Sequence, residues 1–182
     1  MNIIYMHTHD TGRYIEPYGY KVPTPNLTGL AKEGTVFRHA FSAAPTCSPS
    51  RSALLTGLYP HTNGMYGLAH RGFKLHDINR HIVNLLNKNN IETVLCGAHH
   101  VVHGDPHQIG YKDVITDIEY RSDKANAAKV ATYLRQKKEK PFFLSFGMFN
   151  THRDWPDINE DIDENHVMPP FPIYDNEENR KD

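Results

Sequence analysis

Residues 2–12 have the sequence NIIYMHTHDTG, in which a short apolar run passes directly into polar residues. A run of this kind is typical of a buried strand that enters a loop. Residues 92–97 and residues 142–146 are apolar runs of similar length, and polar segments that contain histidine follow both of them. In open α/β sheets the functional groups lie at such strand ends. The sequence therefore predicts three buried strands that bring polar side chains together.

Helix signals alternate with these strands. Proline or a capping residue opens several of the intervening segments, and glycine ends two of them. We expect helices close to residues 24–34, 48–57, 78–89 and 125–138, and a further strand over residues 36–41. This alternation predicts an α/β fold in which helices flank a mostly parallel sheet.

The overall composition argues against several classes of protein. The 182 residues suit one α/β domain, and the balance of 20 Lys and Arg against 21 Asp and Glu argues against a nucleic-acid partner. No apolar run approaches the roughly 20 residues that cross a bilayer, so we expect no membrane partner. Residues 1–6 lack the basic and apolar regions of a signal peptide, so we expect a cytoplasmic location for the chain as given.

The segment from Cys47 to Arg51 has the sequence CSPSR and stands at the predicted start of a helix. Backbone N–H groups and the helix dipole favour negative charge at that position, and Arg51 can point back to the same end. These features predict an anion site that contains a sulfur nucleophile or its derivative. An ordinary buried cysteine in a turn is the alternative. A cysteine-dependent phosphatase fits poorly, because its loop needs more residues between cysteine and arginine.

The longer segment CSPSRSALLTG, residues 47–57, resembles the signature of the formylglycine-dependent sulfatases in the alkaline-phosphatase-like superfamily. The resemblance implies that a formylglycine-generating enzyme oxidises Cys47 to an aldehyde, and that this enzyme requires Pro49 and Arg51. One hydroxyl of the hydrated aldehyde would attack sulfur, and the other would lose its proton and expel sulfate. The implied function is hydrolysis of a sulfuric ester or sulfamate in a sulfated small molecule or glycan.

Other segments extend the resemblance over essentially the whole chain. Residues 3–12 resemble the first strand of the family and its Asp-Asp-x-Gly metal turn. His100 falls on the histidine of the family's G-K-x-H turn, and His152 falls on that of its H-x-P-H turn. Residues 63–68 resemble the N-sulfoglucosamine sulfohydrolase-like branch, and arylsulfatase-like members are the alternative. An alkaline-phosphatase-like fold is therefore implied.

The resemblance also implies a set of site residues. The catalytic residues would be Cys47, Arg51, His100 and His152. Arg51 would stabilise the diol and the metal, and the two histidines would hold or protonate the substrate. Asp10, His9 and Cys47 would bind a divalent metal. We expect Ca²⁺ in that site, with Mg²⁺, Mn²⁺ or Zn²⁺ as alternatives.

Three departures from the family pattern bear on this site. His9 stands where relatives have an aspartate, and imidazole shifts the metal preference toward Mn²⁺ or Zn²⁺. Ala98 stands in place of the lysine of the G-K-x-H turn, which removes a cation expected to hold sulfate. A protonated His99 would replace that cation in part. The family's late metal motif, an aspartate followed by Asn or His and then Gly, is absent from these residues.

The end of the sequence bears on domain organisation. Residues 175–182 have the acidic first turn of a helix but no helix body. We therefore expect residues 1–182 to be the truncated N-terminal part of a sulfatase catalytic domain, incomplete at its C-terminus and inactive alone. The alternatives are a phosphonate or phosphate ester hydrolase that uses the same nucleophile, and a noncatalytic truncated fragment.

Overall fold

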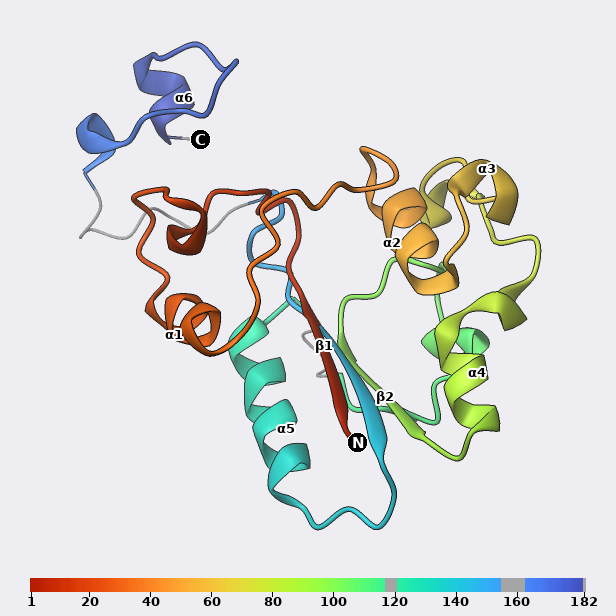
Figure 1. Ribbon diagram of the computed structural model, residues 1–182. Helices are drawn as coiled ribbons and strands as arrows, with labels where there is room; N and C mark the ends of the chain where they lie inside the picture. The colour runs from red at the N-terminus through yellow and green to blue at the C-terminus, as the bar shows by residue number, and fades with distance from the viewer. Residues whose placement is uncertain (117–120, 155–162, 182) are drawn as a thin grey trace. The chain divides into compact units, whose positions relative to one another are not determined.

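A parallel β-sheet forms the centre of residues 1–152 in the structure, a computed structural model that describes residues 1–116, 121–154 and 163–181 (Figure 1). Its described strands are β1 (Ile3–His7), β4 (Phe142–Gly147), β2 (Glu92–Gly97) and β3 (Asp113–Val114), in that order across the sheet. All three pairings are parallel. His7, Gly147 and Gly97 are in register, so β1, β4 and β2 end at the same level. The loops that follow these strands therefore leave the sheet side by side.

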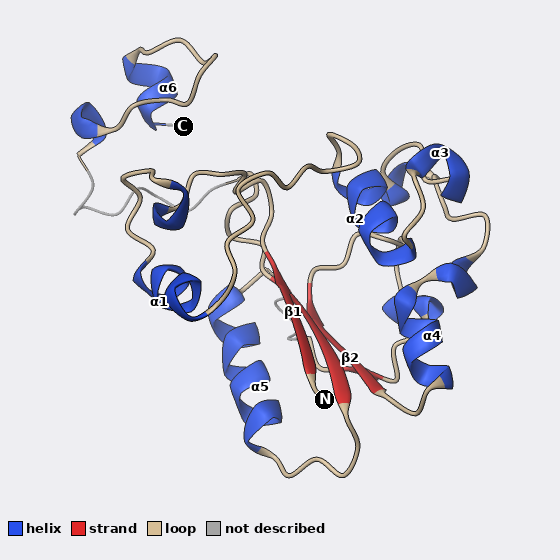
Figure 2. Ribbon diagram, viewed as in Figure 1, coloured by secondary structure: helices blue, strands red, loops and turns tan. Residues whose placement is uncertain are grey.

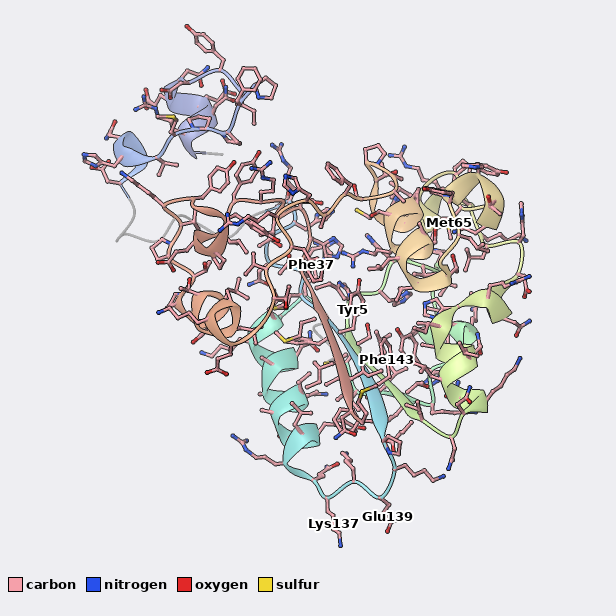
Figure 3. The ribbon with its side chains drawn as sticks, in the orientation of Figure 1. Tyr5, Phe37, Met65, Lys137, Glu139 and Phe143 are labelled. Carbon is pink, nitrogen blue, oxygen red and sulfur yellow. The ribbon has the colours of Figure 1, made fainter. Side chains whose placement is uncertain are left out.

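Helices cover both faces of this sheet (Figure 2). On one face Phe143 packs with Val83 of α4 (Ile82–Lys88), and its ring stacks with that of Tyr5 at 6.4 Å between centroids (Figure 3). On the other face Leu144 clusters with Val130 of α5 (Asp123–Arg135). Strand β4 is buried along its whole length because both of its faces are covered. The predicted architecture, a parallel sheet flanked by helices, is confirmed. The burial predicted for the first strand is wrong: among the described strands β1 has a neighbour on one side only, and Ile4 and Met6 are 47% and 55% exposed.

Three of the four predicted helices are confirmed, one is an exception, and the short helix over residues 60–63 was not predicted. The α-helices are α1 (Pro25–Glu33), α2 (Cys47–Thr56), α3 (Pro60–Asn63), α4, α5 and α6 (Glu177–Lys181), and short 3-10 helices occupy Glu16–Tyr18, Ala69–Arg71, Ile78–Arg80, Pro106–Ile109 and Glu164–His166. The exception is the single helix predicted over residues 78–89. His81 interrupts it with ψ 135°, and the ring Nδ1 of His81 accepts a hydrogen bond from the Val83 N–H at 3.3 Å. This cap makes α4 begin anew at Ile82.

The strand predicted over residues 36–41 is wrong. The structure describes this segment without regular secondary structure, and the side chains of Phe37 and Phe41 are 70% and 88% exposed. A strand needs a neighbour that satisfies its backbone hydrogen bonds, and none of the four described strands pairs with this segment. Instead the Tyr18 hydroxyl donates to the Phe37 carbonyl at 3.1 Å.

Residues 1–152 and residues 153–182 form two compact units. The first unit contains all the described strands. The second contains α6, so the acidic segment expected to begin a helix does begin one. Arg180 in this helix donates a hydrogen bond from Nη2 to Asp175 Oδ2 at 2.9 Å. In the part of the chain that the structure describes, no helix combines the length and the apolar character needed to span a membrane. The assignment of residues 1–182 to one truncated domain stays a prediction.

Candidate active site

Two glycines allow the loops at the carboxyl end of the sheet to approach closely. Gly97 ends β2 with φ +79°, and Gly147 ends β4 beside it. A Cβ atom on Gly97 would overlap the carbonyl oxygen of Gly147, and a Cβ atom on Gly147 would overlap that of Ala98. The Ala98 N–H donates to the Gly147 carbonyl at 2.9 Å. The loop after β2 is therefore held directly against the end of β4.

His9 lies where the loops from β1, β2 and β4 meet. Its surface is 1% exposed, and its ring makes edge contacts with His100, at 5.3 Å between centroids, and with His152, at 5.2 Å. The His9 N–H donates to Thr151 Oγ1 at 3.1 Å, and the Thr151 hydroxyl donates back to the His9 carbonyl. Both ring nitrogens of His9 are buried without a hydrogen-bond partner among the described residues. The structure thus brings together three histidines that the sequence places in three separate loops.

Helix α2 carries Cys47 and Arg51 to the same place. Cys47 is the first residue of α2, is partly exposed, and is a free thiol. Arg51 Nη1 donates a hydrogen bond to His7 Nδ1, and Arg51 Nη2 donates a hydrogen bond to the Thr8 carbonyl at 3.2 Å. Burial is the main effect on the pKa of Arg51 and lowers it, while Tyr5, Cys47 and Asp10 act in the opposite direction. Arg51 is therefore a cation that joins α2 to the end of β1 beside Cys47.

Three of these side chains form a potential metal-binding group. The sulfur of Cys47 and one ring nitrogen each from His9 and His100 all lie within 4.8 Å of one another. Imidazole and thiolate are ligands that suit Zn²⁺, whereas Ca²⁺ prefers oxygen. Asp10, the predicted oxygen ligand, is exposed with φ 48° and is not a member of this group. The side chains present therefore fit a divalent metal of borderline character, and the role of Asp10 stays a prediction.

The pKa values of four histidines in the site are lowered, which favours their neutral form. Burial first, and then the charge of Arg51, lowers the pKa of His7 and of His9 to about 3. Burial also lowers the pKa of His99 to about 4, and it lowers the pKa of His100 despite the opposing charge of Asp10. A neutral ring offers a lone pair to a metal or to a proton. The lowered pKa of His99 disfavours the protonated ring that would replace the lysine cation absent at Ala98.

A cavity of about 670 Å³ opens beside these histidines. Its wall includes His100 and His152, and it also includes two residues that the sequence did not indicate. These are His70, whose ring centroid lies 6.1 Å from that of His100, and Arg121, whose Cζ lies 4.6 Å over the ring of Phe149. Neither residue follows a predicted strand or belongs to a recognised motif. No local pattern marks them, because the fold alone brings their loops to the cavity.

The chain is similar to known proteins over most of its length. The Sulfatase family profile matches residues 1–172. Human (Homo sapiens) N-sulphoglucosamine sulphohydrolase is 33% identical over 146 residues, which cover 72% of this chain and 28% of the relative. Human N-acetylgalactosamine-6-sulfatase is 53% identical over 57 residues, which cover 31% of this chain and 10% of the relative. The chain thus spans less than a third of the length of these curated relatives.

Two solved structures share the fold. Ps i-CgsB in complex with k-i-k-neocarrahexaose has a TM-score of 0.69 and 25% identity, over 99% of this chain and 50% of that one. BT4656 in complex with D-glucosamine-2-N,6-O-disulfate has a TM-score of 0.69 and 21% identity, over 86% of this chain and 35% of that one. The α/β fold of the alkaline-phosphatase-like type that the sequence predicts is therefore confirmed.

Proposed function

Because the chain belongs to the sulfatase family, we propose that it carries the nucleophile for hydrolysis of a sulfuric ester or a sulfamate. The observation that supports this most is the position of Cys47. It opens α2 against the ends of three strands, with its sulfur within 4.8 Å of ring nitrogens of His9 and His100. Oxidation by a formylglycine-generating enzyme would use dioxygen and two external thiols, release sulfide, water and the disulfide of those thiols, and leave an aldehyde at position 47.

The surrounding side chains have the charges that this chemistry needs. Formylglycine supplies a hydrated aldehyde whose one hydroxyl displaces the alcohol or amine from sulfur and whose other hydroxyl, on losing its proton, releases sulfate. Arg51 and the N-terminus of α2 favour an anionic sulfate at this position. Burial lowers the pKa of His100 and so favours the neutral ring, which can accept the proton of the second hydroxyl. His152 lines the cavity and is our candidate for the group that protonates the leaving atom.

A divalent metal would supply further positive charge to the sulfate oxygens. We propose that His9 holds it together with Asp10 and the group derived from Cys47. Ca²⁺ is a hard ion that binds imidazole poorly. If Ca²⁺ occupied the site, the oxygens of Asp10 and of the hydrated aldehyde would have to supply most of its binding. Mn²⁺ and Zn²⁺ accept both imidazole and oxygen. Ca²⁺ therefore stays a prediction, and His9 favours the other ions.

The substrate that we propose is a sulfated sugar or glycan. The curated relatives are named for N-sulphoglucosamine and for N-acetylgalactosamine 6-sulfate, and the solved structure of Ps i-CgsB contains k-i-k-neocarrahexaose. The cavity beside His100 presents imidazole and aromatic rings on which the face of a sugar ring can pack. Arg121 in the same wall supplies a cation for a sulfate or carboxylate group.

Mass spectrometry of the peptide that contains Cys47 tests the proposal. The full-length protein is produced together with a formylglycine-generating enzyme. Conversion of the thiol to an aldehyde should lower the mass of this peptide by about 18 Da, whereas oxidation of a thiol by oxygen addition would raise it. Cys96, which is buried in β2, is the internal control and should stay a thiol. An unmodified Cys47, under conditions in which the same enzyme converts another sulfatase, would contradict the proposal.

Turnover by the converted full-length protein then separates the reaction classes. We expect hydrolysis of an aryl sulfate to exceed hydrolysis of an aryl phosphonate. The reverse order would favour the phosphonate or phosphate ester hydrolase, and no turnover of either compound would favour the noncatalytic alternative.

A further inference from the structure

The group formed by His9, Cys47 and His100 has the geometry of a metal site while Cys47 is still a thiol. Zn²⁺ forms bonds of about 2.0 Å to imidazole nitrogen and about 2.3 Å to sulfur, so a tetrahedral site holds its ligand atoms about 3.3–3.8 Å apart. The three donor atoms here already lie within 4.8 Å of one another. Side-chain movements of about 1 Å would therefore close them around an ion.

The buried nitrogens of the group point to a missing ligand. Both ring nitrogens of His9 and Nδ1 of His100 are buried and have no hydrogen-bond partner among the described residues. His9 is 1% exposed, and the ring of Phe149 packs on it at 5.1 Å between centroids. Buried polar atoms in native proteins are nearly always satisfied, so each such exception calls for an explanation. A metal bound to His9 and His100 would satisfy one nitrogen of each ring.

The backbone around these ligands is already fixed in place. The paired hydrogen bonds between His9 and Thr151 join the loops that follow β1 and β4. The contact between Gly97 and Gly147 fixes the start of the loop that carries His100. Cys47 stands at the N-terminus of α2, where the helix dipole favours negative charge on sulfur. Little ordering of the chain is therefore needed when an ion enters.

We propose that, as long as Cys47 is a thiol, this protein binds one Zn²⁺ through His9, Cys47 and His100, with the fourth position open to water. The group contains no carboxylate among the described residues, so it selects against Ca²⁺ and Mg²⁺. The inference does not rest on the proposed function, because it requires neither an aldehyde nor turnover. Conversion of Cys47 to formylglycine would remove the sulfur ligand and, with it, the sulfur-to-metal bond.

Titration with Co²⁺, a spectroscopic substitute for Zn²⁺, tests the proposal. The full-length protein is produced without the maturation enzyme, checked by mass for an intact Cys47 thiol, and stripped of metal with a chelator. One equivalent of Co²⁺ should produce the sulfur-to-cobalt charge-transfer absorption of a thiolate ligand. Zn²⁺ should abolish that absorption by displacement, and an excess of Ca²⁺ should leave it unchanged.

Variants assign the ligands. Cys47→Ser should lose the charge-transfer absorption, and His9→Ala and His100→Ala should each weaken binding by at least about tenfold. His103→Ala, in the wall of the same cavity, and Cys96→Ser are matched controls and should bind as the wild type does. Circular dichroism checks that each variant folds. If His9→Ala, at a buried position, does not fold, the binding measured for His100→Ala tests the histidine ligands. Absence of the sulfur absorption in the wild type, or equal binding by Cys47→Ser, would overturn the proposal.

Discussion

Acid should destabilise this protein through His81, a buried histidine outside the candidate active site. The side chain is 0% exposed, its Nδ1 accepts the Val83 N–H at 3.3 Å, and its Nε2 has no partner among the described residues. Protonation would break the bond that caps α4 and would leave a buried charge unpaired. Burial is accordingly the main cause that lowers the pKa of His81 to about 4, and His99 adds to it.

The size and direction of the effect follow from this pKa. The value in the unfolded chain is 6.5, so between pH 6.5 and pH 4 the unfolded state binds a proton that the native state does not. The free energy of unfolding therefore falls as the pH falls through this window, and the contribution is fully present only above pH 6.5. The whole shift corresponds to about 3 kcal/mol, of which about 2 kcal/mol would be lost between pH 7 and pH 5.

Urea unfolding of the wild type and of His81→Asn at pH 7 and pH 5 measures the effect. Asparagine caps a helix well and does not titrate, so the variant should lose about 2 kcal/mol less than the wild type between the two pH values. The cavity left by the smaller side chain lowers stability equally at both pH values and cancels in the comparison. His39→Asn, at an exposed histidine, should behave as the wild type does. An equal loss for the wild type and His81→Asn would refute the reasoning.

Three further predictions concern the site. Gly97→Ala should lower the free energy of unfolding by more than about 2 kcal/mol, because the new Cβ atom meets the Gly147 carbonyl. Gly57 also has a positive φ but faces open space, so Gly57→Ala should cost only about 1 kcal/mol, and equal costs in urea unfolding would argue against the close contact at Gly97. Arg51→Lys should lower kcat/KM of the full-length protein at least about tenfold, because an ammonium group does not reproduce the two bonds to His7 and Thr8; full activity at matched aldehyde content would contradict this role. Arg121→Ala should raise KM for a sulfated sugar more than it lowers kcat, since Arg121 lines the cavity, and an unchanged KM would exclude a substrate contact.

The errors of sequence reasoning in this protein have a common origin. The apolar residues at 36–41 have the composition of a strand, yet Phe37 and Phe41 are exposed, because no described strand offers them backbone hydrogen bonds. The helix expected over residues 78–89 has a continuous apolar pattern, but the ring of His81 caps a new helix inside it. In both cases the secondary structure depends on a hydrogen-bond partner, and hydrophobic periodicity does not predict that partner.

For the metal-binding group too, the sequence predicted local features but not the contacts between distant residues. The short segment from Cys47 to Arg51 was enough to predict a charged helix start, because capping and the helix dipole act within one turn. The longer segment over residues 47–57 indicated the family that the comparisons identify over residues 1–172. The sequence did not show that a ring nitrogen of His100 would lie within 4.8 Å of a ring nitrogen of His9 and the sulfur of Cys47.

Local sequence therefore accounts for the buried strands β2 and β4, the start of α2 and the family of this chain, since these depend on residues a few positions apart. It did not show that β1 lies at the edge of the described sheet with Ile4 and Met6 exposed. Folding places ring nitrogens of His9 and His100 beside the sulfur of Cys47. It also brings His70 and Arg121 into the cavity wall. Those relations join loops that are separated by as many as 142 residues, as between His9 and Thr151. They depend on the register of the parallel strands and on the close contact of Gly97 with Gly147, which exist only once the sheet has formed.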